Sequence, residues 1–184
     1  MFGFLKKILG SKSDKDLKEI YPLVDKINTE FDKLKDISDE DLRGKTESFK
    51  LKIKESLKET DDEIKSLKNK YEVSEGSLDE KEEILNSIDK ILEDQNKTIE
   101  NVLNEILPEA FAVVKETARR FSENGSLEVV ATDYDKALSE NKENIKIKGS
   151  KALWLNKWEA AGVSIEWNMI HYAVSYTHLT LPTI

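Results

Sequence analysis

The sequence predicts a mainly helical protein with a small β-hairpin region toward its C-terminal end, an α+β fold class. Of its 184 residues 36% are charged, while only seven are glycine and three are proline, a composition typical of long solvated helices. Apolar residues recur at three- and four-residue steps to about residue 121 and alternate with polar residues after it. The chain has no cysteine, which excludes disulfide scaffolds, cysteine-ligated zinc and thiol nucleophiles.

Residues 1–12 form a basic, apolar tip in front of an acidic body. Three lysines give the tip a charge of +3. Because the net charge of the whole chain is −8, the remaining residues carry a net charge of −11. On a helix its apolar side chains share one broad face, an arrangement suited to the headgroup layer of an acidic membrane. We therefore predict a membrane- or channel-binding helix; the alternative is a helix folded back onto its own domain. The predicted membrane-binding residues are Phe2, Phe4, Leu5, Lys6, Lys7, Ile8 and Leu9.

Residues 13–49 are expected to form the N-terminal helices. Ser13 followed by two aspartates is typical of a helix start, and Pro22 is expected to kink or restart this helix. Ser38 with acidic residues 39–41 marks the start of a second helix. The apolar seam of the first helix consists of Leu17, Ile20, Val24, Ile27, Phe31 and Leu34.

Residues 50–106 are very polar, with a thin apolar line, and predict two antiparallel helices. Gly76 and Ser77 interrupt the pattern, and Ser77 with Glu80 matches a capping box. We interpret this segment as a helical hairpin insertion. It serves either for partner docking or only as a solvated arm, and the second reading is favoured.

Residues 107–172 begin with the most apolar helix pattern, in which Pro108 suits a first turn. Its expected buried face comprises Phe111, Val114, Ala118 and Phe121, and Arg119 with Arg120 either binds phosphate or complements the helix dipole. Strands are predicted at 127–131, 145–148, 152–155 and 163–167, with turns at 149–150 and 161–162. The three tryptophans fall here, so this sheet is expected to bury most of the aromatic area.

Motifs that carry chemistry are scarce. Gly44-Lys45-Thr46 resembles the end of a phosphate-binding loop, but Asp39 stands where that motif needs glycine. Neither histidine has metal-ligand spacing to another, so no metal site is predicted, nor any catalytic residue. The net charge argues against nucleic-acid binding.

Four stretches, in order, resemble the N-terminus of the SecA family, the ATPase motors of bacterial preprotein translocation. They are residues 4–14, 37–46, 107–114 and 167–172, which read FLKKILGSKSD, ISDEDLRGKT, LPEAFAVV and WNMIHY. The 50–106 arm and the tryptophan-bearing hairpin are similar to insertions of the Bacteroidota branch. The resemblance covers residues 1 to about 172.

The resemblance implies a function for each part. The tip would contact acidic phospholipid and the SecYEG channel, and residues 107–172 would begin the first RecA-like, nucleotide-binding motor domain. Met169 and Tyr172 match positions of the family's adenine-recognition motif, which continues with Asp, Val and Gln where this chain has Ala173, Val174 and Ser175. The resemblance also implies a longer parent protein that uses ATP and Mg and acts on preproteins. That parent would be cytoplasmic and peripheral on the inner face of the plasma membrane.

Residues 173–184 are expected to be a non-native tail. Residues 174–183 resemble the translation of a sequencing-library transposon adapter, and Ala173 is what a junction within an Asp codon produces. We therefore expect a SecA fragment without a phosphate-binding loop, which binds no cofactor of its own and lacks ATPase activity. The alternatives are a genuine apolar C-terminal strand and a standalone peripheral-membrane helical adaptor without nucleotide chemistry.

Overall fold

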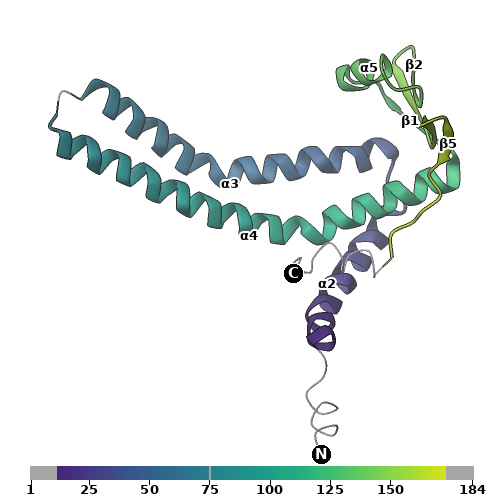
Figure 1. The fold of residues 1–184 in the computed structure, drawn as a ribbon, viewed down its shortest axis with the longest axis horizontal. Helices are drawn as coiled ribbons and strands as arrows, with labels where there is room; N and C mark the ends of the chain where they lie inside the picture. The colour runs from purple at the N-terminus through teal and green to yellow at the C-terminus, as the bar shows by residue number, and fades with distance from the viewer. Residues whose placement is uncertain (1–11, 75, 173–184) are drawn as a thin grey trace, which may run out of the picture. The chain divides into compact units, whose positions relative to one another are not determined.

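The computed structural model describes residues 12–74 and 76–172, and the fold there is mainly helical with small antiparallel strands, as predicted (Figure 1). The chain divides into two compact units, one comprising residues 1–44 and 108–184 and the other residues 45–107. The helices are α2 (Lys12–Leu34), α3 (Asp39–Val73), α4 (Leu78–Asn124) and α5 (Asp133–Ser139). The strands are β1 (Ser126–Val130), β2 (Ile145–Lys148), β3 (Lys151–Leu155), β4 (Lys157–Ala160) and β5 (Val163–Glu166).

Helix α2 buries most of the predicted seam in the first unit, and the burial of Leu17 lies outside what the structure describes. Ile20, Val24, Ile27 and Leu34 are buried, Ile27 completely, and Phe31 is half-buried. The helix is continuous through Pro22, so the expected restart does not occur. Lys115 of α4 contacts α2 beside the seam. Its ammonium lies 4.4 Å from the centre of the Phe31 ring and donates to Asn28 Oδ1 at 2.9 Å.

Ser38 caps α3 as the sequence predicted. Its hydroxyl accepts from the Asp41 N–H at 3.1 Å, and the Leu42 N–H donates to the Ser38 carbonyl at 3.0 Å, the first bond of the helix. Asp39, Glu40 and Asp41 occupy the first turn, where carboxylates complement the helix dipole. Gly44, Lys45 and Thr46 lie within α3, which agrees with rejecting a phosphate-binding loop there.

The second unit is an antiparallel hairpin of α3 and α4 (Figure 1). Ile64, Ile84 and Ile88 form its buried cluster, with Leu67, Tyr71 and Ile91 packed around it. The predicted capping box is present: the Glu80 N–H donates to Ser77 Oγ at 3.3 Å and the Ser77 N–H to Glu80 Oε2 at 3.2 Å. The buried Gln95 of α4 helps to align the two helices, because its Nε2 donates to Thr60 Oγ1 at 2.8 Å and to Asp61 Oδ1 at 2.7 Å, both on α3.

Helix α4 is one helix of 47 residues, so no new helix begins at Pro108 and the prediction of a first-turn proline was wrong. A proline inside a helix removes one backbone hydrogen bond and costs about 3 kcal/mol, yet α4 continues through Pro108. The predicted buried face is also partly wrong, because Val114 is 52% exposed while Ala112, Val113 and Glu116 are buried.

The strands form two small antiparallel sheets in the first unit. The predicted β2–β3 hairpin is the core of a three-stranded sheet ordered β1-β3-β2, with Ile147 opposite Ala152. The second sheet pairs β4 with β5 around Ala161 and Gly162, whose φ values of 51° and 76° fit a type I′ hairpin turn. At the end of α4, Gly125 has φ 69° and its N–H donates to the Phe121 carbonyl at 3.3 Å.

Helix α5 was not predicted from the sequence, and the three tryptophans are only partly buried. Thr132 and Asp135 form a complete capping box for α5, a signal that was present as Thr-x-x-Asp. Trp154, Trp158 and Trp167 are only half-buried, because both sheets are too small to cover large rings on two faces. The expectation that this region buries most of the aromatic area stays a prediction.

Candidate functional site

Met169 and Tyr172, the predicted adenine contacts, lie in the segment after β5, which has no regular secondary structure. Both side chains are open to solvent, 63% exposed for Met169 and 70% for Tyr172. In the same segment, Trp167 and His171 are half-buried, with ring centroids 6.2 Å apart. The segment thus turns two ring-bearing residues inward and leaves a thioether and a phenol available to a flat apolar ligand.

Asn156 anchors this segment to the end of α4. It is 4% exposed; its N–H donates to the Gly125 carbonyl at 2.9 Å, and its carbonyl accepts from the Trp167 N–H at 2.7 Å. Its side-chain amide donates to the Phe121 carbonyl at 3.2 Å and to the Trp167 carbonyl at 3.4 Å. One buried amide therefore sets where residues 167–172 leave the fold. The sequence gives no pattern that would single it out.

A buried ionic cluster centred on Arg120 lies below the α2–α3 connection. Arg120 donates through Nη2 to the carbonyls of Leu34 at 3.0 Å and Ile37 at 2.8 Å, and through Nη1 to Asp39 at 2.5 Å. Its Nε donates to Glu116 Oε1 at 2.7 Å, and the Glu116 side chain is fully buried. Every nitrogen of the guanidinium is engaged within the fold, and Arg120 hydrogen-bonds the carbonyls that end α2 and follow it.

Glu116 stays ionised in this environment. Burial raises the pKa of its carboxyl, but hydrogen bonds from Arg119 and Arg120 outweigh burial, and the net pKa lies below its ordinary value. Arg119 also pairs with the exposed Glu123. The two adjacent arginines therefore have different partners and different burial, which residue type alone does not reveal.

A second buried cluster joins α3 to α5. Arg43 donates through Nη2 to both carboxylate oxygens of Asp135 at 2.8 Å and to Thr132 Oγ1 at 3.2 Å. Trp154 donates its indole N–H to Asp135 Oδ1 at 3.2 Å. Burial raises the pKa of Asp135, but the Thr132 backbone N–H and Arg43 outweigh it and hold the pKa below its ordinary value. These residues brace the small sheet on the start of α3.

A cleft of about 670 Å³ opens beside α5 and the sheets, within the size range of small-molecule pockets. Aromatic, amide, charged and aliphatic side chains line it, so it offers stacking surfaces and hydrogen-bonding groups. Its lining includes Tyr134, Asn141, Lys142, Glu143, Trp154 and Trp158.

The predicted membrane-binding residues, from Phe2 to Leu9, and the tail from residue 173 lie outside the described residues. Among residues 12–74 and 76–172, no helix combines the length and the apolar character needed to cross a bilayer. In the same described part of the chain, no three acidic or histidine side chains converge as metal ligands.

Comparison with known proteins settles the family. The model of the SecA DEAD-like domain matches residues 5–137. This chain belongs to the SecA family. The match includes the second and third of the four motif stretches in full and all but Phe4 of the first, so it covers most of the residues that predicted the family.

Curated SecA relatives match almost the whole chain. The protein translocase subunit SecA of Cytophaga hutchinsonii is 45% identical over 95% of the chain, and that of Porphyromonas gingivalis is 45% identical over 93%. The SecA subunit of Bacteroides fragilis is 42% identical over 93%. The chain spans about one sixth of the length of these relatives, 16% for the first and 15% for the other two. No solved structure matches the chain.

Proposed function

We propose that this chain supplies the N-terminal segment of an ATP-driven preprotein translocase. The observation that carries the proposal is its 45% identity, over 95% of its residues, to a protein translocase subunit SecA. The whole protein couples ATP hydrolysis to the export of preproteins through the SecYEG channel. It works from the cytoplasm, as a peripheral protein on the inner face of the plasma membrane.

The tip and the region after β5 have separate functions in this proposal. Phe2, Phe4, Leu5, Ile8 and Leu9 insert among acidic phospholipids while Lys6 and Lys7 contact their headgroups. Met169 and Tyr172 pack on the adenine of ATP, a contact that depends on shape and apolar surface rather than on charge. Their exposure of 63% and 70%, on a segment anchored by Asn156, supports this assignment.

The chain by itself is inactive as an ATPase in this proposal. Its 184 residues contain no Gly-x-x-x-x-Gly-Lys-Ser/Thr loop, the element that holds the phosphates and their Mg²⁺. Adenine contacts alone supply too little binding energy, so calorimetry with the 184-residue chain and MgATP is expected to detect no binding. Micromolar affinity would overturn this part of the proposal.

A chimera tests the translocase assignment. Residues 1–172 of this chain replace the matching segment of the Cytophaga hutchinsonii SecA, and transport of a preprotein into inside-out membrane vesicles is measured with and without ATP. We expect ATP-dependent transport. A chimera that melts like its parent and binds SecYEG vesicles but moves no preprotein would overturn the proposal.

A matched pair of variants in the same chimera tests the adenine contacts. Met169→Ala with Tyr172→Ala is expected to weaken ATP binding several-fold and leave vesicle binding unchanged. Tyr134→Ala with Val130→Ala removes comparable exposed apolar surface elsewhere, since these residues are 66% and 57% exposed, and is expected to leave ATP binding unchanged. Equal ATP affinity in both double variants would contradict the assignment.

We also propose that the family sequence continues after Tyr172 and that residues 173–184 are not native. Sequencing the source DNA across codons 170–185 without a transposon adapter is expected to show Asp-Val-Gln after Tyr172. A tail that persists to a stop codon would contradict this and favour a standalone membrane-binding module.

A further inference from the structure

The hairpin arm of α4 carries two separate apolar lines. The first faces α3: Ile84, Ile88 and Ile91 join the buried cluster of the hairpin, and Gln95 bonds to Thr60 and Asp61. The second consists of Leu78, Leu85 and Leu92, spaced by seven residues, and continues with Ile99 and Leu103. We call this second line the leucine stripe. Leu85 and Leu92 follow Ile84 and Ile91 by one position, a rotation of about 100° away from the seam.

The leucine stripe is open to solvent. Leu78 is 87% exposed, Leu85 46%, Leu92 44% and Leu103 46%, while Ile99 is half-buried. A seven-residue step returns to nearly the same side of a helix, so these side chains form one continuous line roughly 37 Å long. Its members lie within the second unit, on a helix whose seam with α3 is already complete.

The stripe is not a scatter of surface leucines. Single exposed apolar residues are ordinary on protein surfaces and need no explanation. Between Leu78 and Glu105, however, every other exposed residue of α4 is polar or charged. Exposed apolar side chains on this stretch are therefore confined to one line with a seven-residue repeat, which supplies one of the two apolar positions of each heptad in a coiled-coil seam.

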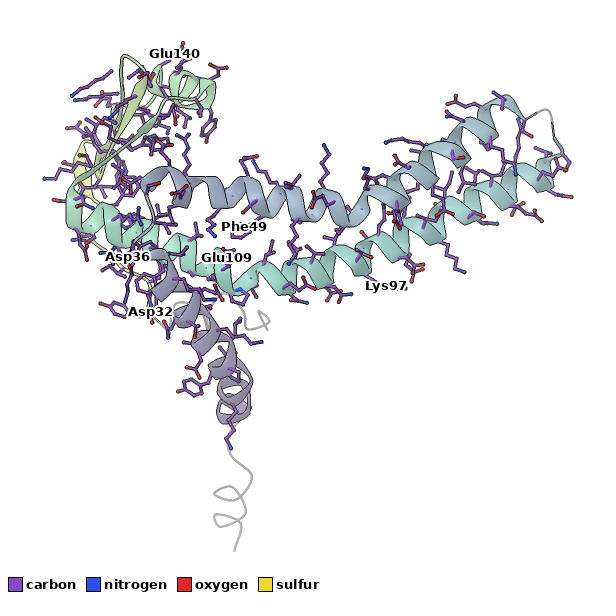
Figure 2. The ribbon with its side chains drawn as sticks, turned by 180° about the vertical axis from the view of Figure 1, so that it is seen from behind. Asp32, Asp36, Phe49, Lys97, Glu109 and Glu140 are labelled. Atoms are coloured by element: carbon purple, nitrogen blue, oxygen red, sulfur yellow. The ribbon has the colours of Figure 1, made fainter. Side chains whose placement is uncertain are left out.

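The solvent-side border of the stripe is acidic. Glu82, Asp89, Glu93 and Glu100 follow it at steps of seven, four and seven residues, so they share one face next to the leucines. Glu93 pairs with Lys97 at 3.1 Å, and Lys97 is labelled in Figure 2. Within the described chain, Glu82, Asp89 and Glu100 form no ion pair. Over residues 78–106 nine acidic residues face three lysines, a net charge of −6.

We propose that the leucine stripe docks a basic amphipathic helix of another protein as a third helix on this hairpin. The apolar face of the partner covers the leucines, and its lysines or arginines flank that face opposite Glu82, Asp89 and Glu100. The acidic border disfavours an acidic membrane surface. It also disfavours a second copy of the same stripe, because two copies would bring like charges together. The partner helix matches the stripe at about 25 residues.

The probe is a synthetic 28-residue helix with leucine at heptad positions a and d and lysine at e and g. A second peptide is identical except for glutamate at e and g. Fluorescence anisotropy measures the binding of each labelled peptide to the 184-residue chain at 50 and 500 mM NaCl. We expect the lysine peptide to bind and the glutamate peptide to bind at least tenfold more weakly.

Variants separate docking on the stripe from general attraction to an acidic protein. Leu85→Gln with Leu92→Gln is expected to weaken the lysine peptide at least tenfold. Leu51→Gln with Val73→Gln, which are 55% and 80% exposed on α3, is expected to leave binding unchanged. Glutamine is a good helix former, and both leucines lie outside the buried cluster, so circular dichroism and thermal melts should match the wild type.

A charge-matched pair completes the test. Glu82→Gln with Asp89→Asn is expected to weaken the lysine peptide and flatten its salt dependence, whereas Glu83→Gln with Glu105→Gln, on the opposite face, is expected to do neither. Equal effects of the two charge pairs, or no effect of the stripe variants, would overturn the proposal. A chain dimer that the Leu85→Gln and Leu92→Gln changes dissociate in sedimentation experiments would also overturn it, in favour of self-association.

Discussion

Arg43 and Asp135 form a two-pronged ion pair, with Nη2 of Arg43 2.8 Å from both carboxylate oxygens, across 92 positions of the sequence. The Asp135 side chain is fully buried and that of Arg43 is 32% exposed. The pair closes the first unit by fastening α5 and the three-stranded sheet to the first turns of α3. Long-range pairs of this kind set the positions of elements that local sequence leaves free.

Removing the carboxylate should destabilise the first unit. Asp135→Ala leaves Arg43, Thr132 and the Trp154 indole N–H without their acceptor, and we expect a loss of about 3 kcal/mol in the free energy of unfolding. Urea denaturation followed by tryptophan fluorescence measures it. Asp133→Asn, at a side chain 99% exposed, is the control and should change stability by less than about 0.5 kcal/mol. Similar values for both would show that the buried pair contributes nothing.

Acid should weaken the same unit. The pKa values of Asp135 and Glu116 lie below their ordinary values, so the stability they contribute is complete above the ordinary carboxyl range. It is lost as the pH falls below about 4, when protons bind the unfolded chain more readily than the folded one. Urea midpoints measured from pH 7 to pH 3 should fall less steeply for Asp135→Asn than for the wild type. Parallel curves would contradict this.

The adjacent arginines of α4 should respond differently to the same substitution. Arg120→Lys removes the guanidinium group, whose nitrogens donate to two backbone carbonyls and two carboxylates at once. A lysine ammonium cannot make all of these bonds, so we expect a loss of about 2 kcal/mol in the free energy of unfolding. Arg119→Lys keeps its charge beside Glu116 and Glu123 at a more exposed position, and should cost less than about 1 kcal/mol. Thermal melts of the two variants compare their losses of stability. A larger loss for Arg119→Lys than for Arg120→Lys would contradict this prediction.

The β4–β5 turn contains a correctable strain. Ala161 has φ 51°, in the left-handed region that disfavours alanine, and it precedes Gly162. Ala161→Asn creates the Asn-Gly pair that type I′ turns prefer, so we expect a gain of about 0.5 kcal/mol in urea denaturation. Ala160→Asn, one residue earlier in β4, should give no gain.

The tip should direct binding to acidic membranes. Deleting residues 2–9 is expected to abolish co-sedimentation of the chain with anionic vesicles, because both the apolar residues and two of the three lysines are lost. Lys6→Glu with Lys7→Glu should weaken co-sedimentation strongly. Lys15→Glu with Lys18→Glu changes the net charge equally and should not. Unchanged binding after the deletion would place the membrane contact elsewhere.

Much of the fold was predictable because its signals are local. The seam from Ile20 to Leu34, the Ser38 cap, the Ser77–Glu80 capping box and the 145–155 hairpin all depend on residues within a few positions of one another. The family was also predictable, because four short motifs occur in order. Pro108 predicted a helix start that does not exist, since the 47-residue helix α4 continues through it.

The sequence by itself determined most of the helices, the hairpins and the family of this protein, because periodicity, caps and motifs act between near neighbours. Only the tertiary structure decided the partners of Arg43, Arg120 and Asn156 and the burial of Asp135, because their contacts join segments far apart in the chain. The same holds for the leucine stripe. Its residues are visible in the sequence, but the packing of α3 against Ile84 and Ile88 decides which apolar line of α4 is covered.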